Sequence, residues 1–149
     1  EFWYPLRACE GMVDLVDSLS RTNRSVGTAE LKITHSPKDL LSLPNAYDRE
    51  KAKGFIERSG LLLLMGLSRD DLLELNKVRP LTPKEISMVA SFSQSKDWIG
   101  SRRQKGAKGA PPGAGKVLLK ISERVGIPVK MLRTATQMAV HDTDNRYQQ

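Results

Sequence analysis

Apolar residues recur at the spacing of α-helices through much of the first 99 residues of the chain. In the segment 11–20 they fall at positions i, i+3, i+4 and i+7, which form one face of a helix. These residues are Met12, Leu15, Val16 and Leu19. The pattern predicts a short helix with this face buried. Residues 21–30 have no period and predict a loop, and the weak alternation of residues 31–36 indicates a short strand.

Four polar residues stand at positions where further helices would begin. They are Ser36, Asn45, Ser68 and Thr82. The side chain of each can accept a hydrogen bond from a free N–H group in the first turn of a helix. Proline follows Ser36 and Thr82, as is common at the first helical position. Glu85, three residues after Thr82, completes a capping box, so we expect a helix to start at each of the four positions.

Two apolar stretches lack a clear period. Residues 61–65 read LLLLM and are apolar on every side, which predicts a buried segment. We interpret it as the close of a helical bundle or a short internal helix. Near the start, Phe2, Trp3 and Tyr4 are expected to hold the N-terminus against the core or a partner. Stacking on single-stranded bases is the alternative use of these rings.

These patterns together predict an all-α protein. Residues 1–99 form a helical body, which could act as a scaffold, an oligomerisation unit or a binding surface for a protein partner. Residues 100–115 contain five glycines, two prolines and three alanines among basic residues. Such a segment buries too little apolar surface to offset its ordering entropy, so we expect a flexible basic connector. Residues 116–149 are predicted to form a small helical unit with a polar tail.

The charge of the chain is unevenly distributed. The 149 residues carry a net charge of +7. Residues 1–95 have 13 basic and 13 acidic side chains and are neutral, whereas residues 96–133 have ten basic and two acidic side chains. A neutral body with one cationic segment is typical of proteins that bind polyanions.

The cationic segment ends in a sequence that superficially resembles a phosphate-binding loop. Gly115 and Lys116 would supply the Gly-Lys pair of a P-loop. That motif also needs glycine at position 110 and serine or threonine at position 117, where the chain has Ala110 and Val117. Valine cannot ligate a magnesium ion, so the sequence argues against a nucleotide site.

Residues 117–141 resemble a helix-turn-helix. Ser122 and Gly126 have the spacing of the small residue in a first helix and the glycine in the turn, where a positive φ is often needed. Serine at position 122 departs mildly from the usual alanine. Apolar residues occupy the positions that such a motif buries: Ile121, Val125, Ile127, Leu132 and Ala135. An ordinary helical pair with a solvated polar face is the alternative.

The predicted second helix, residues 128–140, would carry a polar stripe that ends at His141. Arginine and glutamine can hydrogen-bond base edges, and lysine and threonine can bind backbone oxygens. The basic connector would lie along phosphates or enter a minor groove. The nucleic-acid-binding residues predicted from the stripe and the connector are Arg102, Arg103, Lys105, Lys108, Lys116, Lys120, Lys130, Arg133, Thr134 and Gln137.

Other chemistry finds little support in the sequence. Cys9 is the single cysteine and has no disulfide partner, which favours a reducing, intracellular compartment. His35 and His141 lack partners at metal-ligand spacing, so no metal or cofactor is expected. No catalytic signature, membrane span or secretory signal is present in the sequence. Because the chain starts without methionine, we expect a fragment of a longer protein.

The sequence therefore predicts a non-enzymatic nucleic-acid-binding protein with a regulatory, replication or packaging role, and it favours DNA as the ligand. One alternative is a protein–protein adaptor whose basic arm binds an acidic partner or anionic lipid. Another is an RNA-binding, nucleoprotein-like domain of a virus or phage. A homo-oligomer is compatible with each of these hypotheses.

Overall fold

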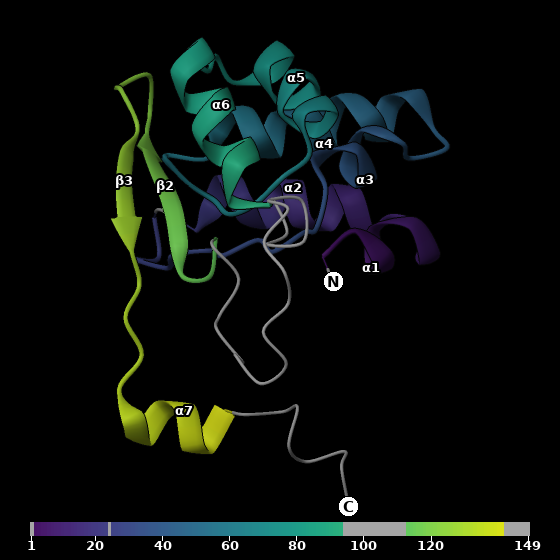
Figure 1. Ribbon diagram of the computed structural model, residues 1–149. Coiled ribbons are helices and arrows are strands. Elements are labelled where there is room, and N and C mark those ends of the chain that lie inside the picture. Colours follow the sequence, from purple (N-terminus) through teal and green to yellow (C-terminus); the bar gives the residue numbers. More distant parts are fainter. Residues whose placement is uncertain (1, 24, 94–112, 142–149) are drawn as a thin grey trace, which may run out of the picture.

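The computed structural model describes residues 2–23, 25–93 and 113–141 (Figure 1). Its helices are α1 (Trp3–Ala8), α2 (Met12–Thr22), α3 (Pro37–Leu41), α4 (Ala46–Arg58), α5 (Arg69–Val78), α6 (Pro83–Phe92) and α7 (Ala135–His141). Its strands are β1 (Leu61–Leu64), β2 (Lys116–Ile121) and β3 (Ile127–Lys130). The strands form one antiparallel sheet in the order β1-β2-β3. The prediction of an all-α fold is therefore wrong, because the protein combines helices with a sheet.

The predicted helix starts are confirmed by their caps. Ser36, Asn45 and Ser68 each accept a backbone N–H hydrogen bond in the first turn of α3, α4 and α5. Thr82 and Glu85 form the reciprocal capping box of α6, with Thr82 N donating to Glu85 Oε2 at 2.6 Å. These local signals fix where the helices begin before any tertiary contact is considered.

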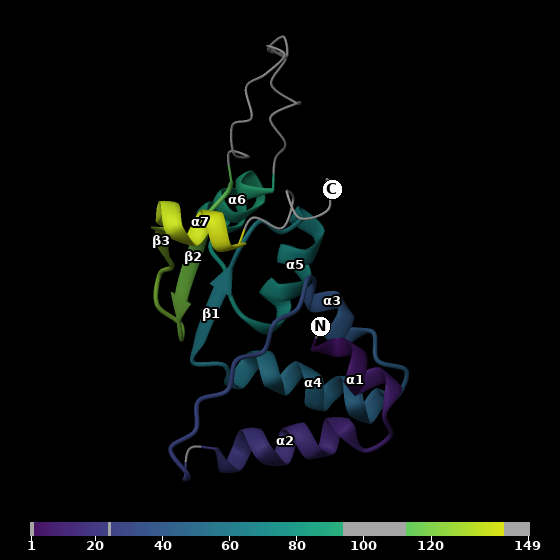
Figure 2. The same cartoon turned by 90° about the horizontal axis from the view of Figure 1, so that it is seen from below.

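The helix predicted around residues 11–20 is confirmed as α2, and Met12 and Val16 of the predicted face pack against the core. The buried face is nevertheless shifted from the predicted one. Leu15 and Leu19 are 53% and 47% exposed, whereas Asp17 is buried. Asp17 accepts hydrogen bonds from Arg21 and from Arg58 of α4, and the bond from Arg21 helps hold the pKa of Asp17 below its ordinary value. Figure 2 shows α2 and α4 side by side. The ion-paired carboxylate of Asp17 therefore faces α4. The apolar pattern had predicted that Leu15 and Leu19 would be buried instead.

The segment 61–65 is a strand rather than a helix over its first four residues. Leu61 and Leu64 pair with Ile121 and Leu118 at the two ends of the β1–β2 ladder. The partner strand lies more than 50 residues away in the sequence, so local periodicity could not reveal the pairing. The strand predicted for residues 31–36 is not formed. That stretch has no regular secondary structure, and Phe2 N donates to Ile33 O at 3.1 Å.

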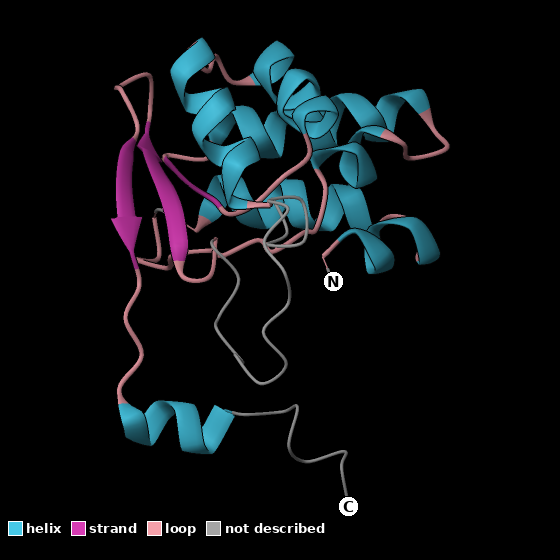
Figure 3. Ribbon diagram, viewed as in Figure 1, coloured by secondary structure: helices cyan, strands magenta, loops and turns pink. Residues whose placement is uncertain are grey.

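The core lies between the helices and one face of the sheet. Helices α1 to α6 gather on one side of the strands (Figure 3). Leu72, Val89 and Leu118 are fully buried in this core. The rings of Phe2 and Phe55 meet edge to face, with centroids 6.0 Å apart, and Trp3 also packs against the core. The expected anchoring of the N-terminus against the core is confirmed for Phe2 and Trp3.

The predicted helix-turn-helix is not formed. The segment expected to be its first helix is β2, and Gly126 precedes β3 rather than closing a helix. The segment expected to be the second helix consists of β3, an extended stretch at residues 131–134 and α7. In the run KVLLKI, Val117, Leu118 and Lys120 are buried and Leu119 is half-buried. The run pairs with β1 over four residues, and this ladder outweighs the helical pattern.

Candidate nucleic-acid interface

The ten residues predicted to bind nucleic acid divide into two groups. Arg102, Arg103, Lys105 and Lys108 lie outside the described residues, as does most of the predicted connector. The other six lie on or after the β2–β3 hairpin: Lys116, Lys120, Lys130, Arg133, Thr134 and Gln137. These six residues differ in secondary structure and in burial.

Lys116 and Lys130 lie directly opposite each other at the open end of the hairpin. Side chains in such a cross-strand pair have Cβ atoms roughly 5 Å apart. Both lysines are exposed, and neither forms an ion pair with another described residue. The ammonium of Lys116 lies 6.0 Å from the ring centroid of Phe92, at the outer limit of a cation–π contact. Two like charges are thus held together without a described counter-ion.

The backbone beside this pair holds the open end of the hairpin in register. Met131 N donates to Gly115 O at 2.6 Å and continues the ladder by one step. Gly115 has φ +73°, and an added Cβ would lie 2.6 Å from Met131 O. Glycine is needed here for both its positive φ and the close approach of the β3 end.

Arg133 follows in the extended stretch between β3 and α7 and is exposed. Figure 1 shows this stretch leaving the open end of the hairpin. Arg133 forms no ion pair with any residue in the described ranges. We refer to Lys116, Lys130 and Arg133 as the basic cluster.

Thr134 and Gln137 hydrogen-bond to each other. Gln137 N donates to Thr134 Oγ1 at 3.2 Å, and Thr134 N donates to Gln137 Oε1 at 2.9 Å. This reciprocal pair is a capping box at the start of α7. The predicted polar stripe is also absent, because Lys130 lies in a strand and Arg133 in an extended segment. The structure therefore gives no helical face on which these side chains could read bases together.

Lys120 is buried and points into the protein. Its Nζ lies 3.1 Å from Glu85 Oε1 and donates to Arg124 O at 3.2 Å. Only 3% of Lys120 and 4% of Glu85 are exposed. The placement of Lys120 does not suit phosphate binding, and we leave it out of the interface. Lys120 points inward because side chains alternate between the two faces of a strand. The interpretation of this segment as a helix could not predict that orientation.

Glu85 has a second role that the sequence analysis did not predict. Besides capping α6, its Oε1 accepts a hydrogen bond from Gly126 N at 2.6 Å. Burial favours a raised pKa for Glu85, but the bonds from Thr82, Gly126 and Lys120 outweigh it and lower the pKa below the ordinary value. Glu85 thus joins the hairpin to the start of α6. The capping-box spacing pointed to Glu85, but nothing local pointed to its partners on the hairpin.

Gly126 is required for a different reason from the one the sequence suggested. Its φ is not among the positive values of the described residues. An added Cβ would instead lie 2.9 Å from Glu85 Oε1 and from Leu118 Cδ1. The glycine lets the hairpin approach the buried carboxylate closely.

The described ranges lack two other kinds of site. They contain no group of three or more His, Cys, Asp or Glu side chains that could hold a metal ion. No helix in the same ranges has the length and apolar character needed to cross a membrane.

Comparison of the chain with protein-family models, with curated proteins and with solved structures gave no match.

Proposed function

We propose that this protein binds nucleic acid through the phosphate backbone, with the basic cluster as part of the contact surface. The observation that carries the proposal is the opposition of Lys116 and Lys130 across the hairpin, with no ion pair from either to a described residue. Like charges directly opposite each other destabilise a sheet. A string of phosphates on this surface would relieve that repulsion.

The distribution of charge along the chain supports the same surface. Gly113 to Lys116 lead into β2 directly after the segment that contains Arg102, Arg103, Lys105 and Lys108. The sequence thus tethers four further cations to the end of the hairpin that carries the basic cluster. Counter-ion release by such a set favours binding at low salt for any nucleic acid.

The proposed contact is to phosphates and not to base edges. Thr134 and Gln137, which the sequence suggested as base readers, bond to each other in the α7 cap. The preference for DNA rested on the helix-turn-helix, which is not formed. Phosphate contacts position a protein without selecting a sequence, so duplex DNA, single-stranded DNA and RNA should all bind.

The test is a fluorescence-anisotropy titration of the full chain with all three ligands at one low salt concentration. The variant Lys116→Gln, Lys130→Gln, Arg133→Gln removes the basic cluster. Each lost phosphate contact weakens binding at low salt, so we expect Kd to rise by roughly ten-fold or more for every ligand.

The matched control is the variant Arg7→Gln, Lys77→Gln, Lys84→Gln. It also replaces two lysines and one arginine, but at exposed sites on α1, α5 and α6. Both variants have the same net charge. We expect the control to change Kd by less than about three-fold. Equal losses in both variants, or no loss in either, would contradict binding at the basic cluster.

A further inference from the structure

The sheet has a second face that the helices do not cover. Successive side chains of a strand point to opposite faces, and directly paired residues share a face. Leu62, Leu64, Leu118 and Lys120 belong to the inner face, which meets the helices. The intervening residues form the outer face: Leu61, Leu63, Val117, Leu119, Ile121, Ile127 and Val129.

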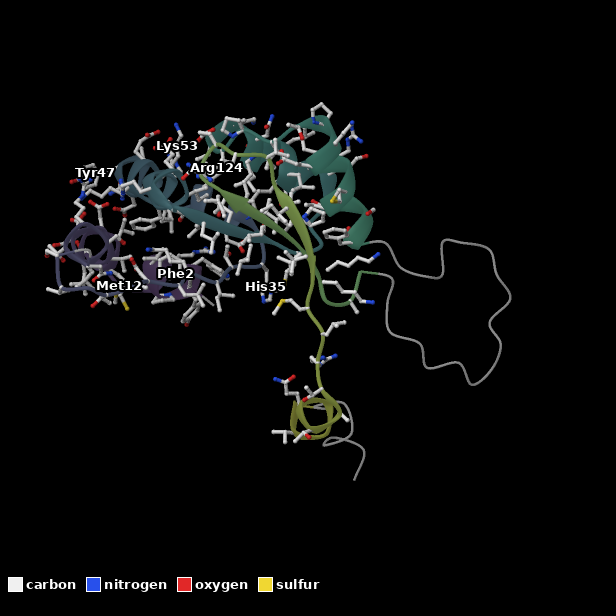
Figure 4. The ribbon with its side chains drawn as sticks, turned by 90° about the vertical axis from the view of Figure 1, so that its left-hand side faces the viewer. Phe2, Met12, His35, Tyr47, Lys53 and Arg124 are labelled. Carbon is white, nitrogen blue, oxygen red and sulfur yellow. The ribbon has the colours of Figure 1, made fainter. Side chains whose placement is uncertain are left out.

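Every residue of the outer face is aliphatic. Five of the seven are exposed, whereas Leu119 is half-buried and Val117 is 2% exposed. Leu61 and Leu63 are each 51% exposed, and Ile127 is 52% exposed. Ile121 and Val129 are exposed to a smaller degree. In Figure 4, which is seen from the hairpin side, no described helix crosses in front of the strands.

Two methionines extend this face beyond the strands. Met65 continues the alternation of β1, and Met131 continues that of β3, where its N–H still bonds to Gly115 O. Met65 is 56% exposed and Met131 is 58% exposed. Flexible, polarizable methionine side chains are common at surfaces that adapt to a partner.

The composition of the outer face is that of a buried sheet. An antiparallel sheet with one face in water normally alternates apolar and polar residues, whereas apolar residues on both faces are typical of a sheet covered on both sides. Together the exposed aliphatic residues and the two methionines present on the order of 700 Å², more than the largest apolar patch on a typical monomer, about 300–600 Å².

We propose that the outer face is covered by the same face of a second copy of this chain, sheet against sheet. Two such faces related by a two-fold axis would bury at most about 1,400 Å² in total, within the usual range for specific protein interfaces. Aliphatic side chains of two sheets interdigitate well at a separation of roughly 10 Å.

A second copy suits this face because the face is chemically uniform. It offers no charged or hydrogen-bonding side chain that would select an unlike partner, and an aliphatic surface is complementary to itself. Lys116 and Lys130 belong to the inner-face set of the alternation and lie at the open end of the hairpin. The dimer would therefore leave these two lysines of the basic cluster accessible, and the inference does not depend on nucleic-acid binding.

The test is sedimentation velocity of nuclease-treated protein from about 1 to 200 µM, a range that resolves weak dimers. The variants are Leu63→Lys and Ile127→Lys, in the middle row of the outer face. The control is Val26→Lys, which is 71% exposed in a loop and is more accessible than either. Circular dichroism and Tm of each variant establish that it is folded.

We expect wild type and Val26→Lys to dimerise alike, in 1 M NaCl as well as at low salt. Each outer-face lysine should raise the dimer Kd by about 100-fold or more, because a charge would be buried without a partner. Ile127→Thr, a milder change, serves if a lysine variant fails to fold, and it should also weaken the dimer. A monomeric wild type at 200 µM, or outer-face variants that dimerise like wild type, would overturn the proposal.

Discussion

Glu85 and Lys120 form a buried ion pair that joins the hairpin to the helices. Lys120 donates to Glu85 and to Arg124 O, and Glu85 accepts from Thr82 and Gly126. Each charge therefore has several partners, which a buried ion pair needs if it is to offset its desolvation. The cationic segment consequently contributes one lysine to the core, although its charge suggested a surface role.

Glu85→Gln should destabilise the protein by about 3–5 kcal/mol at pH 7, because it leaves the buried Lys120 without its counter-ion. The double variant Glu85→Gln, Lys120→Met removes both charges and should lose less than the sum of the two single variants. Urea denaturation of all four proteins measures these differences. Additive losses would contradict a direct interaction between the two residues.

The same pair predicts a pH dependence. The folded-state pKa of Glu85 is lowered, so the unfolded state takes up its proton first as the pH falls. The stabilisation is complete well above the unfolded pKa of about 4.3 and is lost as the pH falls through the folded value. The difference in unfolding free energy between wild type and Glu85→Gln should therefore shrink below about pH 4.3. A difference that grows with acidification would contradict the assignment.

At the scale of elements, the open end of the hairpin depends on Gly115. Gly115→Ala should cost about 1–2 kcal/mol through its positive φ, with a further loss from the contact between the new Cβ and Met131 O. Gly27→Ala is the control, because Gly27 also has a positive φ (+66°) but an added Cβ there meets nothing within 4 Å.

The two variants separate backbone strain from the clash at the end of the ladder. We expect Gly115→Ala to lose more stability than Gly27→Ala in urea denaturation, and to weaken nucleic-acid binding because Lys116 and Lys130 lose their register. Equal losses of stability would show that the contact with Met131 contributes nothing.

The helices of the body could be predicted from the sequence because their signals are local. Caps at Ser36, Asn45, Ser68 and Thr82 act within one turn and work the same way in any fold. The strands could not be predicted, because β1 and β2 stabilise each other across more than 50 residues of sequence. A short apolar run such as 61–65 fits a buried helix and a buried strand equally well until its partner is known.

The candidate site was predictable in part for the same reason. The charge count located the cationic segment and, within it, Lys116, Lys130 and Arg133. It could not separate them from Lys120, because only strand alternation turns one lysine inward and leaves the others exposed. Nor could it anticipate that Thr134 and Gln137 cap a helix that begins at residue 135.

At the scale of the whole molecule, charge and apolar surface lie on different parts of the hairpin. The basic cluster occupies its open end, and the aliphatic outer face covers one side of the sheet. A dimer formed through the outer face would carry two basic clusters on one particle. Two clusters on one ligand strand would bind with an avidity that a single cluster lacks.

The central claim is that the basic cluster contacts phosphates, and the dependence of affinity on salt tests it most directly. Log Kd measured against log salt concentration has a slope of about 0.9 for each phosphate contact on duplex DNA. We expect the variant Lys116→Gln, Lys130→Gln, Arg133→Gln to lower the wild-type slope by about two to three, and the variant Arg7→Gln, Lys77→Gln, Lys84→Gln to leave it unchanged. A slope that is the same in all three proteins, or a wild-type affinity that does not vary with salt, would contradict the account.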